Sequence, residues 1–181
     1  MDIFLLIEIR EVLGIVIFIF LLMTLLGVGM YYSLTVDKSW KPKFHKKWFI
    51  ICPLAALVIT LFVGIRMDSY TEFLIREEIN EKVIKFGNDY NSQLYVNDTI
   101  RPVLKKDLIT IFDYEIFENH NRSLIIGDIK INYKAKDDSL VLNLLQVNRY
   151  ENLYQVYYSK YKNKGKVGYI ETDLLKQFNS P

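Results

Sequence analysis

Hydrophobic residues are concentrated in two uncharged runs near the start of the chain. Val12 to Leu34 and Trp48 to Ile65 contain no charged residue. At a rise of about 1.5 Å per residue, helices of roughly 20 residues match a hydrocarbon core about 30 Å thick. The pattern therefore predicts two N-terminal transmembrane helices, over residues 12–34 and 48–66.

The connector between these runs is basic. Against the single acidic residue Asp37, it carries Lys38, Lys41, Lys43, Lys46 and Lys47. Short lysine-rich loops stay on the cytoplasmic side of a membrane. We therefore expect a cytoplasmic loop over 35–47, both termini outside the cytoplasm, an external or interfacial lead-in over 1–11, and one extracytoplasmic domain over 67–181.

Aromatic residues flank the predicted spans. Tyrosine and tryptophan favour the membrane–water interface, so the expected interface anchors are Tyr31, Tyr32, Trp40 and Trp48. Neither span carries the intramembrane charge that channels and proton relays use. Small residues in the segment 27–29 permit close helix approach, so assembly of copies through the spans stays open.

The pattern after the second run changes to an amphipathic helix over 68–86. Ser69 and Glu72 have the spacing of a capping box, and Glu78–Lys82 has the spacing of an i,i+4 ion pair. An apolar stripe at helical spacing predicts a core-facing side; its members are Leu74, Ile75, Ile79, Val83 and Phe86.

The remaining chain contains one further helix followed by strands. Pro102 opens a helix whose apolar face is Val103, Leu104, Leu108, Ile111 and Phe112. Alternating or continuous apolar runs predict strands over 92–96, 128–134, 140–147, 153–161 and 167–170. Thr172 is expected to cap a terminal helix. Helices first and a meander of strands afterwards indicate an α+β domain with a mostly antiparallel sheet.

Composition excludes several classes of function. The net charge is +2, and acidic and basic residues nearly balance after Arg66, which argues against a nucleic-acid binder. Cys52 is the only cysteine, so the external domain must fold without an internal disulfide. His45 and His120 are expected on opposite sides of the membrane, and no known catalytic or metal-binding motif occurs. We therefore expect no catalytic, cofactor-binding or metal-binding residues.

The segment 150–169 is unusually rich in tyrosine and lysine. Alternation along a strand places Tyr154, Val156 and Tyr158 on one face, which we assign to the core because it includes the valine. The other face presents Tyr157 and Tyr161 as candidate protein contacts, with Lys160 and Lys162 at the rim. A plain sheet edge, or a site for an anionic lipid headgroup or wall polymer, remains open.

The end of the chain also carries a resemblance. Residues 154–161, YQVYYSKY, and 168–174, GYIETDL, resemble the closing segment of small bacterial envelope proteins that pair two membrane spans with one extracytoplasmic α+β domain. The resemblance implies a bacterial cytoplasmic membrane location and brings no catalytic residues. Ser159 stands where that pattern has proline.

These observations favour a membrane-anchored protein-binding module, whose partners would be the lipid bilayer and a protein at the external membrane surface. One specific form is an immunity protein against a toxin that acts at the membrane. An accessory subunit of an envelope complex is the alternative. An enzyme acting on lipid or wall polymer is the third hypothesis.

Overall fold

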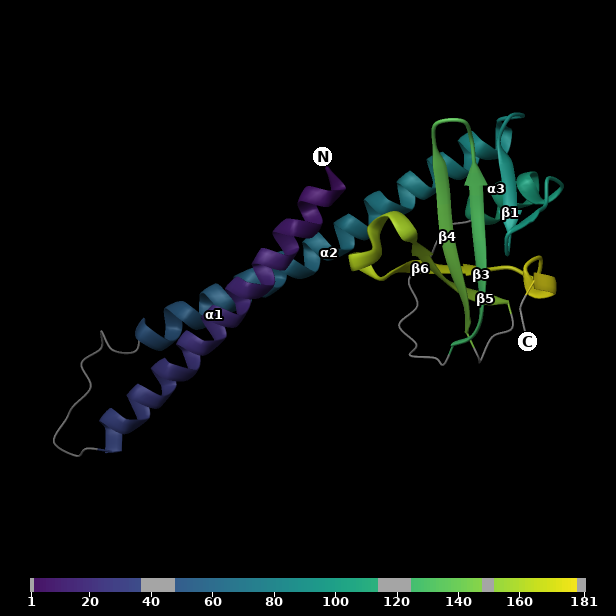
Figure 1. Cartoon of the computed structure of the whole chain (residues 1–181). Coiled ribbons are helices and arrows are strands. Elements are labelled where there is room, and N and C mark those ends of the chain that lie inside the picture. The colour runs from purple at the N-terminus through teal and green to yellow at the C-terminus, as the bar shows by residue number, and fades with distance from the viewer. Residues whose placement is uncertain (1, 37–47, 114–124, 148–151, 179–181) are drawn as a thin grey trace. The chain divides into compact units, whose positions relative to one another are not determined.

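The computed structural model describes residues 2–36, 48–113, 125–147 and 152–178. The chain divides into two compact units, Met1–Thr71 and Glu72–Pro181. Long apolar helices come first and an antiparallel sheet follows (Figure 1), so the predicted α+β class is confirmed. Residues 37–47 of the predicted basic loop, including Trp40, and the segment around His120 lie outside the described residues, whereas residues 35 and 36 of that loop belong to the first helix.

The first unit is built from helices. Helix α1 spans Ile3–Val36, and α2 spans Trp48–Asn88. Both contain a segment that is long and apolar enough to cross a membrane. A Cβ on Gly64 would lie 3.1 Å from Cδ2 of Leu13, so the missing side chain permits close packing of α2 against α1. Arg10 and Asp68 also pair across the two helices, with Nε and Oδ1 3.1 Å apart.

The structure contradicts the predicted helix start at Ser69. Ser69 lies inside helix α2, and its hydroxyl donates a hydrogen bond to the carbonyl of Ile65, four residues earlier, at 3.2 Å. This bond is typical of a serine inside a helix rather than at its cap.

The end of α2 agrees with the sequence. The Ser92 hydroxyl donates to the carbonyl of Phe86 at 2.5 Å, and Lys105 Nζ donates to that of Asp89 at 2.6 Å.

The second unit contains a six-stranded antiparallel sheet in the order β2-β1-β3-β4-β5-β6. The strands are β1 (Gln93–Val96), β2 (Thr99–Ile100), β3 (Ile125–Lys134), β4 (Ser139–Val147), β5 (Leu153–Tyr158) and β6 (Lys166–Glu171). In Figure 1, β5 and β6 run at a large angle to β3 and β4, so the sheet is strongly twisted. Strand β2 was not predicted, and it pairs with β1 across the turn Asn97–Asp98, where both residues have positive φ.

One face of the sheet forms the core. Leu142 pairs with Ile131 of β3 and with Tyr158 of β5, so alternate residues of neighbouring strands share this face. Phe86 of α2 stacks on Tyr133 at 6.0 Å between ring centroids, which places α2 against it. The predicted stripe of α2 is confirmed at its four fully buried positions, Ile75, Ile79, Val83 and Phe86.

Helix α3 (Leu104–Asp113) lies beside the end of α2. A Cβ on Gly87 would collide with the side chain of Ile109, so the two helices approach closely at that glycine. Leu104, Leu108 and Phe112 are buried as predicted. The prediction that Val103 belongs to the core is wrong, because Val103 precedes the helix and is 83% exposed.

The end of the chain differs most from the prediction. Strand β5 stops at Tyr158, and a 3-10 segment, η2 (Ser159–Lys164), follows it. The predicted terminal helix is only a short 3-10 turn, η3 (Lys176–Phe178). Thr172 still accepts a hydrogen bond, from the amide of Leu174 at 3.2 Å.

Candidate functional site

A cluster of polar side chains joins α2 to the end of β5. Glu78 Oε1 accepts a hydrogen bond from Lys160 Nζ at 2.6 Å and one from the Tyr158 hydroxyl at 3.2 Å. Its second oxygen, Oε2, accepts one from the Tyr161 hydroxyl at 2.5 Å. We call Glu78, Tyr158, Lys160 and Tyr161 the Glu78 cluster. It connects residues that are up to 83 positions apart in the chain.

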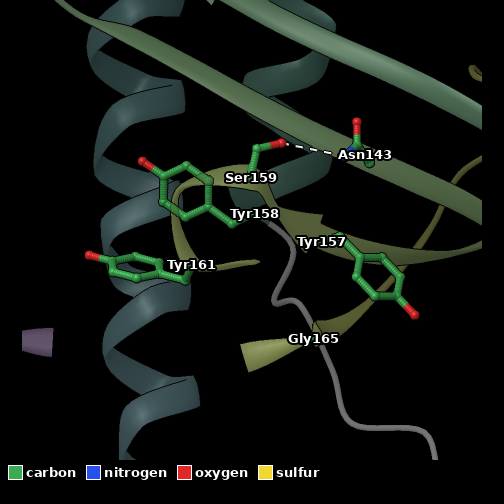
Figure 2. Close-up of a pocket in the computed structure, with 6 residues that line it drawn as sticks. All are labelled: Asn143, Tyr157, Tyr158, Ser159, Tyr161 and Gly165. Carbon is green, nitrogen blue, oxygen red and sulfur yellow. Dashed lines mark hydrogen bonds between the residues drawn. The ribbon is translucent and has the colours of Figure 1, made fainter. Parts of the chain in front are cut away.

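The 3-10 segment η2 builds this cluster. Tyr158 is the extended last residue of β5, and Tyr161 lies at a kink inside η2 with φ −114° and ψ 58°, so the chain changes direction between the two tyrosines. Their rings meet edge to face, 5.4 Å between centroids. In Figure 2 both hydroxyls point toward the helix, whereas the Tyr157 ring points the opposite way. A continued strand would have placed Tyr161 on the same side as Tyr157.

The electrostatics of the cluster keep Glu78 charged. Partial burial disfavours the carboxylate, but the hydrogen bonds from Lys160 and Tyr161 outweigh it and hold the pKa of Glu78 below its ordinary value of 4.5. Burial and the neighbouring carboxylate raise the pKa of Tyr158 and of Tyr161. A carboxylate held by three donors with a lowered pKa is a poor general base at neutral pH. Its role is to fix the position of η2.

The same turn also lines an open cavity of about 260 Å³. Figure 2 shows its lining residues, Asn143, Tyr157, Tyr158, Ser159, Tyr161 and Gly165. The Asn143 side-chain amide donates to the Ser159 hydroxyl at 3.4 Å. Gly165 has φ +79°, a conformation that favours glycine, and ends η2 before β6. The lining is uncharged and rich in hydroxyl groups.

Tyr157 is held in place at the edge of this cavity. Its hydroxyl donates to Oε1 of Gln155 at 3.0 Å. The Gln155 amide in turn reaches the Tyr169 hydroxyl at 3.5 Å, and that hydroxyl accepts from Lys166 Nζ at 3.1 Å. The Tyr157 ring is half-buried, whereas Gln155 and Tyr169 are buried. The arrangement presents one face of a fixed aromatic ring.

The predicted site residues meet different outcomes. Tyr154, Val156 and Tyr158 are buried as predicted. The prediction that Tyr161 lies on the exposed face is wrong: Tyr161 is 4% exposed, because η2 turns it back toward Glu78.

The two lysines predicted at the rim, Lys160 and Lys162, also have different outcomes. Lys160 is exposed but pairs with Glu78 at 2.6 Å, and the side chain of Lys162 lies outside the described part of the chain. The predicted Glu78–Lys82 pair is replaced, since Lys82 instead pairs with Asp138 at 2.8 Å.

Sequence reasoning missed Glu78, Asn143 and Gln155. Only the position of Glu78 beside a buried helical stripe could have signalled it.

Among the predicted membrane anchors, Tyr32 is 71% exposed. The side chains of Tyr31 and Trp48 lie outside what the structure describes, as does Trp40. Within the described ranges, no group of three or more His, Cys, Asp or Glu side chains is arranged to hold a metal ion.

Comparison with protein-family models, with curated proteins and with solved structures finds no match for this chain.

Proposed function

We propose that this chain is a membrane-anchored protein-binding module. Its apolar helices support the anchoring. The most hydrophobic windows of α1 and α2 have no buried residue, and an apolar surface of this size is unfavourable in water. The backbone groups of a helix are paired within it, which suits a hydrocarbon environment. The lysine-rich connector supports a cytoplasmic loop, with the α+β unit outside the cytoplasm.

The observation that carries the binding proposal is the fixed, half-buried ring of Tyr157 beside an open cavity. Tyrosines of this kind supply large contact area at low entropic cost, and they are frequent among the residues that dominate binding energy. The hydrogen bond to Gln155 orders the ring before a partner arrives, which lowers the entropy lost on binding.

A specific form of this function is an immunity protein that recognises a toxin acting at the membrane. A small tethered unit with a preformed tyrosine surface suits that task. The alternative is an accessory subunit that assembles through its spans. The observation in favour of the alternative is that a Cβ on Gly14 or Gly29 would meet nothing within 4 Å, so another helix could approach there.

The test is affinity capture of the tagged full-length protein from native membranes. Tyr157→Ala should lose most of the captured partner while the chain stays folded. Tyr90→Ala is the matched control, because Tyr90 is fully exposed in the turn after α2, and it should capture as the wild type does. Equal capture by a folded Tyr157→Ala protein would show that the partner binds elsewhere.

A further inference from the structure

Three side chains line one exposed face of α2 in the first unit. Phe62, Arg66 and Tyr70 are successive i,i+4 neighbours, so they lie above one another on the helix. Phe62 is 59% exposed and Tyr70 is 46% exposed. The guanidinium carbon of Arg66 lies 5.3 Å from the centroid of the Phe62 ring, within the range of a cation–π contact.

The charge of Arg66 is not neutralised by a carboxylate of the described residues. Arg10, by contrast, pairs with Asp68 at 3.1 Å. A guanidinium that lies near a ring still carries its N–H donors in the plane of the group, and these donors can bind an anion. Phosphate oxygens match this planar donor pattern in a bidentate way.

The position of Arg66 indicates which anion is available. Arg66 directly follows the uncharged run that ends at Ile65, which is where a spanning helix leaves the hydrocarbon. Arginine at such a boundary can bury its apolar stem against lipid while its charged group contacts the headgroups. Phe62 lies one turn toward the hydrocarbon, and Tyr70 lies one turn toward water, a level that tyrosine favours.

We infer that Arg66 binds the phosphate of a phospholipid headgroup from its position over the Phe62 ring, with Tyr70 in the interface one turn further along α2. The inference rests on the membrane anchoring proposed above. It assigns to the middle of α2, where the uncharged run ends, a lipid contact that fixes the depth of the helix. The Arg10–Asp68 pair, already neutral, takes no part in that contact.

The experiment measures the distance from arginine to lipid phosphorus. The full-length chain, with arginine labelled at ¹³Cζ, is reconstituted into vesicles of phosphatidylglycerol and phosphatidylethanolamine. Rotational-echo double-resonance NMR then reports dephasing of ¹³Cζ by lipid ³¹P. We expect dephasing in the wild type, its loss in Arg66→Gln, and its retention in Arg10→Gln.

Dephasing that is unchanged in Arg66→Gln, or lost only in Arg10→Gln, would overturn the inference. Alkaline carbonate extraction of the same vesicles separates the two proposals. A chain that carbonate releases is not anchored, so the proposed function fails and the lipid contact fails with it. A retained chain without Arg66-dependent dephasing contradicts only the lipid contact.

Discussion

Arg76 of α2 donates a hydrogen bond from Nε to the backbone carbonyl of Val167, at 2.9 Å. Val167 is the extra residue of a bulge in the β5–β6 pair, where Val156 pairs with Gly168 and Tyr157 with Lys166. A bulge leaves its extra residue without a ladder partner. The arginine therefore binds a carbonyl at the irregular point of the β5–β6 pairing.

Replacing Arg76 with methionine should destabilise the second unit. A hydrogen bond from a charged donor contributes about 1.5–3 kcal/mol, so a loss in this range is expected in the free energy of unfolding. Chemical denaturation of the full chain in micelles, followed by near-UV circular dichroism, measures it. Glu72→Gln, which removes the charge that pairs with Arg76 at 3.4 Å but leaves the Arg76–Val167 bond in place, is the control and should cost less. Equal losses would mean that the bond to Val167 contributes little.

Removing the hydroxyl of Tyr133 should not destabilise the protein. Tyr133 is fully buried, and its hydroxyl has no hydrogen-bond partner among the described residues. Tyr133→Phe should therefore leave stability unchanged or raise it by about 1 kcal/mol, since an unpaired polar group is expensive to bury. Tyr158→Phe is the matched comparison. It loses the bond to Glu78 and should cost about 1 kcal/mol. A lower melting temperature for Tyr133→Phe than for Tyr158→Phe would contradict this prediction.

Gly87→Ala tests the close approach of α2 and α3. Alanine favours a helix over glycine by about 1 kcal/mol, but its Cβ would collide with Ile109. Overpacking of this kind costs about 1–3 kcal/mol, so a net loss of stability is expected. Ile109→Ala in the same chain should remove the penalty, giving a non-additive double mutant. Gly14→Ala, which meets open space, should show no loss.

Stability should fall in acid because of Glu78. Its pKa is lowered in the folded chain relative to 4.5, so the folded state binds the proton more weakly than the unfolded state. The stabilisation is therefore present above about pH 4.5 and is lost as the pH falls through the lower, folded value. Glu78→Gln should show a shallower decline of the unfolding free energy over this window. Asp138, whose pKa is lowered first by its hydrogen bond with Lys82, contributes with the same sign. An unchanged acid slope in Glu78→Gln would contradict the role given to the cluster.

Membrane orientation is testable by thiol labelling. In a Cys52→Ser chain, a cysteine at Ser39 should resist an impermeant thiol reagent in intact cells, because the lysine loop is expected in the cytoplasm. A cysteine at Ser139, which is exposed at the start of β4, should react. The opposite labelling pattern would invert the proposed topology.

The sheet was largely predictable because one face of it is buried. Ile129, Ile131 and Tyr133 alternate with polar residues, and all three are fully buried. A period of two identifies such a strand from local sequence alone. Strand β2 has only two residues, both exposed, and it leaves no such pattern.

The candidate site was predictable only up to Tyr158. Alternation correctly assigned Tyr154 and Val156 to the core, but it continued the strand to Tyr161. The strand ends where η2 turns toward Glu78. That partner belongs to α2, far away in the sequence, where its spacing from Lys82 suggested a local ion pair instead. Local periodicity contains no information about such a distant contact.

The bond between Glu78 and Tyr161 can form only late in the synthesis of the chain. Chains emerge from the ribosome N-terminus first, so α2 is made well before its partners. Its apolar stripe stays uncovered until the strands follow, and closing a loop of this length is entropically costly. Neighbouring antiparallel strands can pair early, but the cluster forms only after η2 has been synthesised. A chain that stops before Ser159 would lack the bonds that Lys160 and Tyr161 form with Glu78. It would also lack β6, so β5 would be left as an unpaired edge strand, and we expect proteases and chaperones to recognise such a chain as unfinished.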